Sequence, residues 1–261
     1  MGENWTFDAE NLTAGYDGKT VIADVNFSVG AGERILLCGA NGLGKSTLLR
    51  TLALLQPPVS GKCSFSASSE KRRTVLIPAR IPKVQGFSVE QFVAASCYLE
   101  TDWLGRIPAR LKNQIKTAVE NVGIPELLHR DISTLSDGEF QKAAIATALV
   151  QKADVVLLDE PTAFLDVDSR AAVLSTIDSM SPEISVIFSS HDIYESSRHC
   201  NRIFGIVRDA GTPKFIDSGA NVSVAERRAV LSECFRSAAS VLKDAEAQNQ
   251  RALPRYFRVM K

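Results

Sequence analysis

The decisive stretch of this 261-residue sequence is Gly39-Ala40-Asn41-Gly42-Leu43-Gly44-Lys45-Ser46-Thr47. Gly39 and Gly44 are separated by four residues, and a lysine and a serine follow at once, which is the spacing of a phosphate-binding loop. Glycines let backbone N–H groups converge on phosphate oxygens without obstruction by side chains. Lys45 can supply a positive charge to the β- and γ-phosphates, and the Ser46 hydroxyl can bind Mg²⁺. The stretch therefore predicts a site for a nucleotide phosphate and its Mg²⁺ ion.

The residues on both sides of this stretch have the character that such a loop requires. Before it, Arg34-Ile35-Leu36-Leu37-Cys38 is nearly continuously apolar, which is typical of a strand buried on both faces of a parallel sheet. After it we expect a helix that ends before Pro57-Pro58 and whose dipole points at the bound anion. The apolar face of this helix is expected to contain Leu48, Leu49, Leu52 and Leu55. The alternative, a glycine-rich turn that binds nothing, is disfavoured by this strand–loop–helix context.

Strands alternate with helices along most of the chain, which predicts an α/β fold with a mainly parallel sheet. The expected strands are Val25–Val29, Arg34–Cys38, Thr74–Ile77, Val155–Leu158, Ser185–Phe188 and one near Ile203–Val207. The later helices are expected at Ala143–Val150, around Arg170–Ser179 and from Ala225 to about Gln250. From about Ala79 to Ser133 helical segments dominate, Val89–Tyr98 and Leu111–Val122 among them, which predicts a helical insert. The serine-rich residues from about Ser60 to Ser69 are expected to form a hairpin or a loop.

The composition is ordinary for a globular protein, with 45% hydrophobic and 23% charged residues. Thirty basic residues balance thirty acidic ones, whereas proteins that bind nucleic acid usually carry a basic excess, so we expect no nucleic-acid partner. Apolar runs are far shorter than the roughly 20 residues of a membrane-spanning helix. The first residues lack the pattern of a secretory signal. The five dispersed cysteines fit buried thiols in a reduced compartment better than a disulfide framework.

A second motif completes the chemistry of a phosphate site. The apolar strand Val155–Leu158 ends in two carboxylates, Asp159 and Glu160. Asp159 can hold Mg²⁺ at the end of the strand, as in other phosphate-loop NTPases. Glu160 can accept a proton from the attacking water as a general base. Two adjacent acids could also form a solvated turn, but the phosphate-binding loop upstream favours the catalytic interpretation.

Two further polar clusters stand beside predicted elements. Leu135-Ser136-Asp137-Gly138-Glu139 precedes the alanine-rich helix, and Ser136 with Glu139 matches a capping box. Gly138 in the first turn costs helix stability, and close approach of a phosphate to the backbone would explain it. His191 follows the strand Ser185–Phe188, at the end where open α/β sheets place groups that contact ligands. A lone histidine is more often structural, so both roles stay open from the residues alone.

Together these motifs resemble the ATP-binding cassette (ABC) family over roughly Asn4 to Gly219. The resemblance implies a P-loop NTPase fold of the ABC ATPase type. Such a fold has a mainly parallel sheet core, an N-terminal antiparallel β subdomain and a helical subdomain, here at about 79–140. It also implies that residues 1–219 form the ATP-binding domain, with residues 220–261 as a C-terminal helical extension.

The resemblance also implies roles for individual residues. Gly39–Thr47 falls on the Walker A loop, and Val155–Asp159 falls on the Walker B strand. Glu160 falls on the catalytic glutamate and His191 on the switch histidine. The remaining assignments are Tyr16 as the aromatic that stacks on adenine, Leu135–Glu139 as the signature that acts on the partner copy's ATP, and Asp166 as the aspartate of the D-loop. A tyrosine at a strand end could instead belong to the core.

Two motifs depart from the usual family pattern, and both departures are typical of one branch of the family. The signature, usually LSGGQ, has Asp137 for glycine and Glu139 for glutamine. Two extra carboxylates should repel a γ-phosphate unless the helix dipole and backbone donors outweigh them. LSDGE is familiar in the branch that imports iron-siderophores, haem and cobalamin, so we interpret it as a marker of that branch. The D-loop pair Ala163-Phe164 and the segment Trp103–Arg106 agree with this branch.

The third departure is the Q-loop, whose glutamine normally contacts Mg²⁺ and links to the membrane partner. Leu76-Ile77-Pro78-Ala79-Arg80 aligns with it and places Ala79 where glutamine is expected. Gln85, slightly downstream, is the alternative candidate for that role.

The resemblance implies the ATPase subunit of an ABC importer, with ATP and Mg²⁺ as its cofactors. Two copies would pair head to tail at the cytoplasmic face of the cell membrane and drive a separate integral membrane permease that a solute-binding protein supplies. The alternatives are a soluble ABC ATPase in DNA repair or translation and an inactive regulator. The absence of coiled coils, tandem cassettes and basic linkers argues against the first. Ala79 alone favours the second, whereas Glu160 and His191 oppose it. The transported solute is not encoded in this subunit's motifs.

Overall fold

The computed structural model describes residues 5–66, 72–100, 106–209, 212–220 and 222–234. Its strands are β1 (Thr6–Tyr16), β2 (Lys19–Gly30), β3 (Arg34–Gly39), β4 (Ser60–Phe65), β5 (Thr74–Ile77), β6 (Val155–Leu158), β7 (Ser185–Ser189), β8 (Arg202–Asp209) and β9 (Thr212–Asp217). Its helices are α1 (Lys45–Leu52), α2 (Val89–Ala95), α3 (Ala109–Asn121), α4 (Asp137–Val150), α5 (Val167–Asp178) and α6 (Ile193–Ser196). Short 3₁₀ turns occur at Tyr98–Glu100, Pro125–Leu127, Ile132–Thr134 and Ser197–His199. Among the described residues, no helix has both the length and the apolar character needed to cross a membrane.

One sheet in the order β4-β1-β2-β9-β8-β3-β7-β6-β5 forms the centre of the fold. Strands β8, β3, β7, β6 and β5 pair in parallel, so their carboxyl ends lie at one edge. Strands β6 and β7 are buried along their whole length, as continuous apolar runs predict. The expected α/β fold with a mainly parallel core is confirmed. It places the ends of β3, β6 and β7 beside one another, where a ligand can meet all three.

The N-terminal part of the sheet is antiparallel. β1 pairs with β2 on one side and with β4 on the other. Of the hairpin or loop expected at Ser60–Ser69, Ser60–Phe65 forms the strand β4, whose Phe65 packs beside Trp5 and Phe7. β9 was not expected, and it pairs antiparallel with β8. Its alternating half-buried pattern is too weak to identify a strand without its neighbour.

Helix α1 follows the phosphate loop directly, but it is shorter than expected. Leu48, Leu49 and Leu52 are fully buried, as predicted. The prediction that Leu55 belongs to this face is wrong, because Leu55 lies beyond the helix and is 72% exposed. The chain leaves the helical direction at Leu54, whose φ of +57° turns it away from the core.

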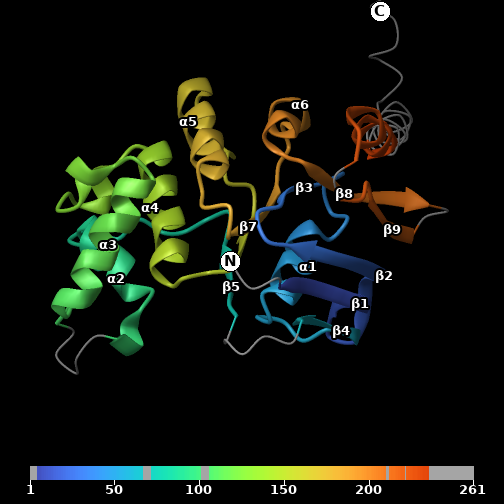
Figure 1. The fold of residues 1–261 in the computed structure, drawn as a ribbon, viewed down its shortest axis with the longest axis horizontal. Coiled ribbons are helices and arrows are strands. Elements are labelled where there is room, and N and C mark those ends of the chain that lie inside the picture. Colours follow the sequence, from blue (N-terminus) through green and yellow to red (C-terminus); the bar gives the residue numbers. More distant parts are fainter. Residues whose placement is uncertain (1–4, 67–71, 101–105, 210–211, 221, 235–261) are drawn as a thin grey trace, which may run out of the picture.

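Helices α2, α3 and α4 gather on one side of the molecule, opposite the strands β1, β2 and β4 (Figure 1). α3 packs against α2 and α4, and α4 also contacts α5 and the edge strand β5. α2 ends at Ala95, three residues before the expected Tyr98, where a 3₁₀ turn begins. Trp103 to Gly105, and most of the helix expected from Ala225 to Gln250, lie outside the described residues, although 224–234 is helical.

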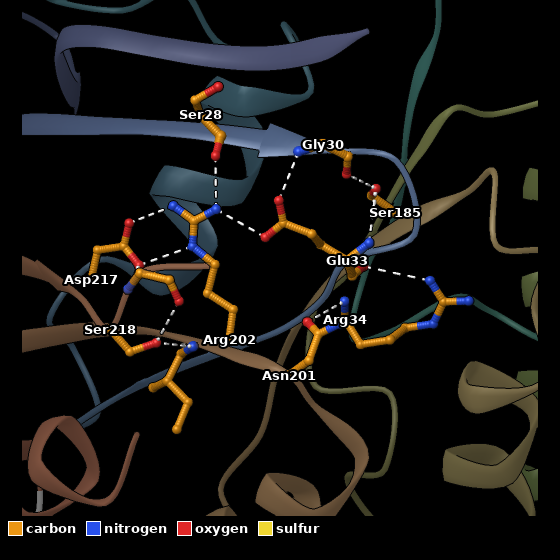
Figure 2. Close-up of polar contacts among 11 residues, drawn as sticks. Ser28, Gly30, Glu33, Arg34, Ser185, Asn201, Arg202, Asp217 and Ser218 are labelled. Atoms are coloured by element: carbon orange, nitrogen blue, oxygen red, sulfur yellow. Dashed lines mark hydrogen bonds and ion pairs between the residues drawn. The ribbon is translucent and has the colours of Figure 1, made fainter. Parts of the chain in front are cut away.

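A buried cation, Arg202, connects strands β2, β8 and β9 at the amino end of β8. Figure 2 shows the guanidinium of Arg202, on β8, between Asp217, Glu33 and the Ser28 carbonyl. Its nitrogens lie 2.5 and 3.0 Å from the Asp217 oxygens, 2.9 Å from Glu33 Oε2 and 2.7 Å from the Ser28 oxygen. Burial alone lowers the pKa of Arg202, but hydrogen bonds and charge from the two carboxylates outweigh it and raise that pKa.

Candidate nucleotide and catalytic site

The phosphate loop connects β3 to α1, and the chain's own packing requires glycine at both of its ends. A Cβ on Gly39 would lie 2.5 Å from the Ile206 carbonyl oxygen. A Cβ on Gly44, whose φ is +99°, would lie 2.4 Å from Val21 Cγ1. These two glycines therefore let the loop fit between β8 and β2 before any phosphate is considered. Of the other predicted contacts, Ala40, Asn41, Gly42 and Leu43 lie in the loop, and Ser46 and Thr47 lie in the first turn of α1.

Lys45 begins α1 and curls back beneath the loop. Its side-chain nitrogen donates to the carbonyl oxygens of Gly39, at 2.8 Å, and Ala40, at 3.3 Å. Burial lowers the pKa of this ammonium, while the nearby charges of Glu160 and Asp159 act in the opposite direction. A positive charge held between loop carbonyls and two carboxylates is well placed to transfer its contacts to a phosphate.

Asp159 and Glu160 are held by a serine that the sequence patterns did not single out. The Ser189 hydroxyl donates to Asp159 Oδ1 at 3.0 Å and accepts from the Glu160 backbone N–H at 2.8 Å. Ser189 ends β7, which pairs in parallel with β6, so the two strand ends lie side by side. The available signal was its position directly after the apolar run Ser185–Phe188. Asp159 is only 8% exposed, and Ser189 fully buried, so this arrangement is well shielded from water.

Glu160 and His191 meet directly. His191 Nε2 lies 2.6 Å from Glu160 Oε1, a short hydrogen-bonding distance. The side chain of Glu160 is 24% exposed and that of His191 48%, so water can reach both. Glu160 also has a φ of +52°, which is uncommon for a residue with a Cβ and marks local backbone strain. The fold therefore brings together a carboxylate and an imidazole that are 31 positions apart in sequence.

The signature residues begin α4, in the helical group and apart from α1 and β3 (Figure 1). The capping box is confirmed: the Ser136 hydroxyl accepts from the Glu139 N–H, and the Glu139 carboxylate accepts from the Ser136 N–H. Gly138 has a packing reason of its own, because a Cβ there would lie 2.8 Å from the Ser169 Cβ on α5. A phosphate contact is therefore not needed to explain this glycine, although it remains compatible with one. Leu135 is buried, whereas Asp137 is exposed.

Asp166 and Tyr16 lie on different elements, at the start of α5 and at the end of β1. Asp166 caps α5 and accepts from the Ser169 N–H at 2.8 Å and from its hydroxyl at 3.1 Å. These hydrogen bonds lower the pKa of Asp166. Tyr16 ends β1 and is 55% exposed, so the alternative of a core tyrosine is wrong. The β1–β2 hairpin that holds Tyr16 also supplies Val21, which contacts the phosphate loop.

The donor set fits Mg²⁺ and ATP. A hydroxyl at Ser46 and a carboxylate at Asp159 are oxygen ligands, and Mg²⁺ commonly completes its shell with phosphate oxygens and water. No cluster of three or more histidine, cysteine or acidic side chains that could hold a metal occurs among the described residues. Ala79 is half-buried and Gln85 exposed, and both lie in the segment between β5 and α2.

Comparison with known proteins decides the family. Residues 22–163 match the family described as ABC transporter. The chain belongs to this family. Its ATP-binding subunits hydrolyse ATP, and the chain is an ATPase of this kind.

Curated relatives support the same assignment. The petrobactin import ATP-binding protein FpuD of Bacillus anthracis is 30% identical, over 76% of this chain and 77% of that protein. The cobalamin import ATP-binding protein BtuD of Halobacterium salinarum is 31% identical over 81% of this chain, which spans 56% of that longer protein. A solved structure described as an inward-facing, metal-chelate type ABC transporter has a TM-score of 0.71 at 24% identity, over 88% of this chain and 90% of that one. The last likeness shows the shared fold.

Proposed function

We propose that this ABC ATPase is the subunit that energises an importer of metal chelates, such as an iron-siderophore, haem or cobalamin, through a separate membrane permease. The names of the petrobactin and cobalamin relatives and the LSDGE signature support this substrate class. The domain is proposed to span residues 1–219, with its helical part at about 79–140 and an extension at 220–261. Such a subunit would act as a peripheral protein at the cytoplasmic face of the membrane.

Hydrolysis is proposed to depend on Glu160. The observation that supports this role is the 2.6 Å contact with His191, at the edge of the sheet where the phosphate loop also lies. Lys45 would bind the β- and γ-phosphates, and Ser46 with Asp159 would hold the Mg²⁺ that neutralises developing charge. Glu160 would take the proton of the attacking water, and His191 would orient the Glu160 carboxylate toward that water. Tyr16 would stack on adenine.

The complete site is proposed to need a second copy. The signature of this chain lies on α4, away from its own phosphate loop, so it would serve the ATP of the partner in a head-to-tail dimer. Phe164 and Tyr194 lie near Glu160 and are 76% and 78% exposed. Two exposed aromatic side chains at this place support a contact surface for the second copy. Closure of this dimer would drive the permease, and hydrolysis would reset it.

Replacement of Glu160 by glutamine tests this mechanism. Glu160→Gln keeps the size of the side chain but removes the proton acceptor, so turnover should fall about 10²-fold or more while ATP binding persists. The variant should also remain as an ATP-bound dimer in size-exclusion chromatography, and ADP should not produce that dimer. Glu183→Gln, at an exposed position, is the matched control and should behave as the parent chain. A Glu160→Gln chain that hydrolyses ATP normally would contradict the assigned base.

Coupling to import needs a separate measurement. The chain should be reconstituted in vesicles with a permease and a solute-binding protein of a metal-chelate importer. Uptake of a metal chelate should then require ATP and intact Glu160. ATP hydrolysis that no permease stimulates would instead favour an ATPase that is not coupled to transport.

A further inference from the structure

The acidic signature raises an electrostatic problem that the structure resolves within one chain. In the proposed dimer, Asp137 and Glu139 would face the phosphates bound to the partner, and two carboxylates there should repel them. The Glu139 carboxylate is turned back onto the Ser136 N–H at 2.8 Å, so the first turn of α4 already uses it. Asp137 is different, because its side chain is 66% exposed.

Lys83 is the cation that meets Asp137. Its side-chain nitrogen lies 2.7 Å from Asp137 Oδ1 and 2.8 Å from the Leu135 carbonyl oxygen. The same nitrogen lies 5.5 Å from the centre of the Phe140 ring, within the range of a cation–π contact. The Lys83 side chain is only 26% exposed. One lysine thus contacts three residues around the start of α4.

Lys83 belongs to the segment that contains the unusual Ala79. A groove of about 580 Å³ separates this segment from α4 and from the D-loop. Lys83 contacts the signature on one side of the groove, and Arg80 lies 5.2 Å from the Phe164 ring on the D-loop side. The two cations of this segment therefore touch both motifs that the proposed dimer needs.

We propose that Lys83 is a positioning residue for the dimer: it neutralises Asp137 and holds the signature to the Q-loop segment, so that an acidic signature can face the partner's ATP. The inference rests on the proposed function, because it assumes that the signature acts on a second copy. Lys83 itself touches Asp137 and Leu135, not the reacting atoms. An ordinary surface ion pair would stabilise the monomer slightly and leave ATP-driven pairing unchanged.

The test measures dimer formation in the Glu160→Gln background by analytical ultracentrifugation over a range of ATP concentrations. Lys83→Met keeps an unbranched side chain of similar length but removes the charge. If the uncompensated charge of Asp137 acts across the dimer with the free energy of one partly exposed ion pair, each signature loses about 3-fold in pairing. Two signatures in each dimer then weaken the dimerisation constant about 10-fold. Lys83→Arg should retain most pairing, and adding Asp137→Asn to Lys83→Met should restore most of it.

The controls distinguish an effect of the Lys83 charge on pairing from an effect on folding. Lys112→Met, at an exposed position on α3, should pair as the background does. Melting of Lys83→Met without nucleotide should shift by no more than about 2–4 °C, the scale of one surface ion pair. If Lys83→Met proves unstable, Lys83→Arg alone still decides, because loss of pairing in a variant that keeps the charge overturns the proposal.

The outcomes are distinct. If the Glu160→Gln background itself forms no ATP-dependent dimer, the proposed function fails, and this inference with it. If that background pairs but Lys83→Met pairs equally well, only the role of Lys83 is refuted. A pairing defect that Asp137→Asn does not relieve also overturns it, because the defect would then not arise from an exposed negative charge.

Discussion

Arg202→Met should destabilise the chain by about 3 kcal/mol. Arg202 makes four polar contacts of 3.0 Å or less, and its side chain is 5% exposed. Removing one partner of a fully buried ion pair costs about 3–5 kcal/mol, because a charge is left unpaired. Here the side chains of Glu33 and Asp217 are 16% and 21% exposed, so water relieves part of the cost. Gly30 and Gly219 also still donate backbone N–H groups to them. The lower end of the range therefore applies.

The free energy of unfolding should be measured by urea titration, together with thermal melting. For a chain of this size, about 3 kcal/mol corresponds to a fall in Tm of about 6–12 °C. Arg110→Met, exposed on α3, is the matched control and should stay within about 0.5 kcal/mol of the parent. Adding Glu33→Gln and Asp217→Asn to Arg202→Met should recover part of the loss, because it removes the unpaired charges. A loss below about 1 kcal/mol, or no recovery, would refute this reasoning.

Three further predictions concern the nucleotide. Lys45→Ala should abolish ATP binding or hydrolysis, because the phosphates lose a fixed charge; unchanged affinity and turnover would exclude the phosphate-loop role. Tyr16→Ala should weaken ATP binding by about 1–2 kcal/mol, the scale of aromatic stacking on a base, with little change in melting without nucleotide; calorimetry that finds normal affinity would contradict stacking. Ala79→Gln should leave affinity about unchanged and raise turnover modestly, since water can replace the missing oxygen on Mg²⁺; a large loss of turnover in Gln85→Ala instead would assign the role to Gln85.

Some features of this protein follow from local sequence, because short-range geometry is enough to produce them. The strand Val155–Leu158 and the capping box at Ser136 occur as the residues predict. A continuous apolar run is stable mainly when both faces are covered, and a serine three residues before a glutamate closes its own hydrogen bonds. The expected strand and helix on either side of Gly39–Thr47 also occur, as β3 and α1.

Other features depend on chain segments that are distant in sequence. Ser189 can hold Asp159 only because β6 and β7 pair in parallel; the position of Ser189 after an apolar run suggests a strand end but not this partner. Lys83 meets Asp137 across 54 positions. Packing against α5 is also sufficient to require glycine at position 138. Sequence alone determined which chemical groups this ATPase carries, because each group belongs to a short motif whose residue types and spacing are local. Only the tertiary structure decided which charges meet, because a pairing between distant residues is set by how strands and helices pack.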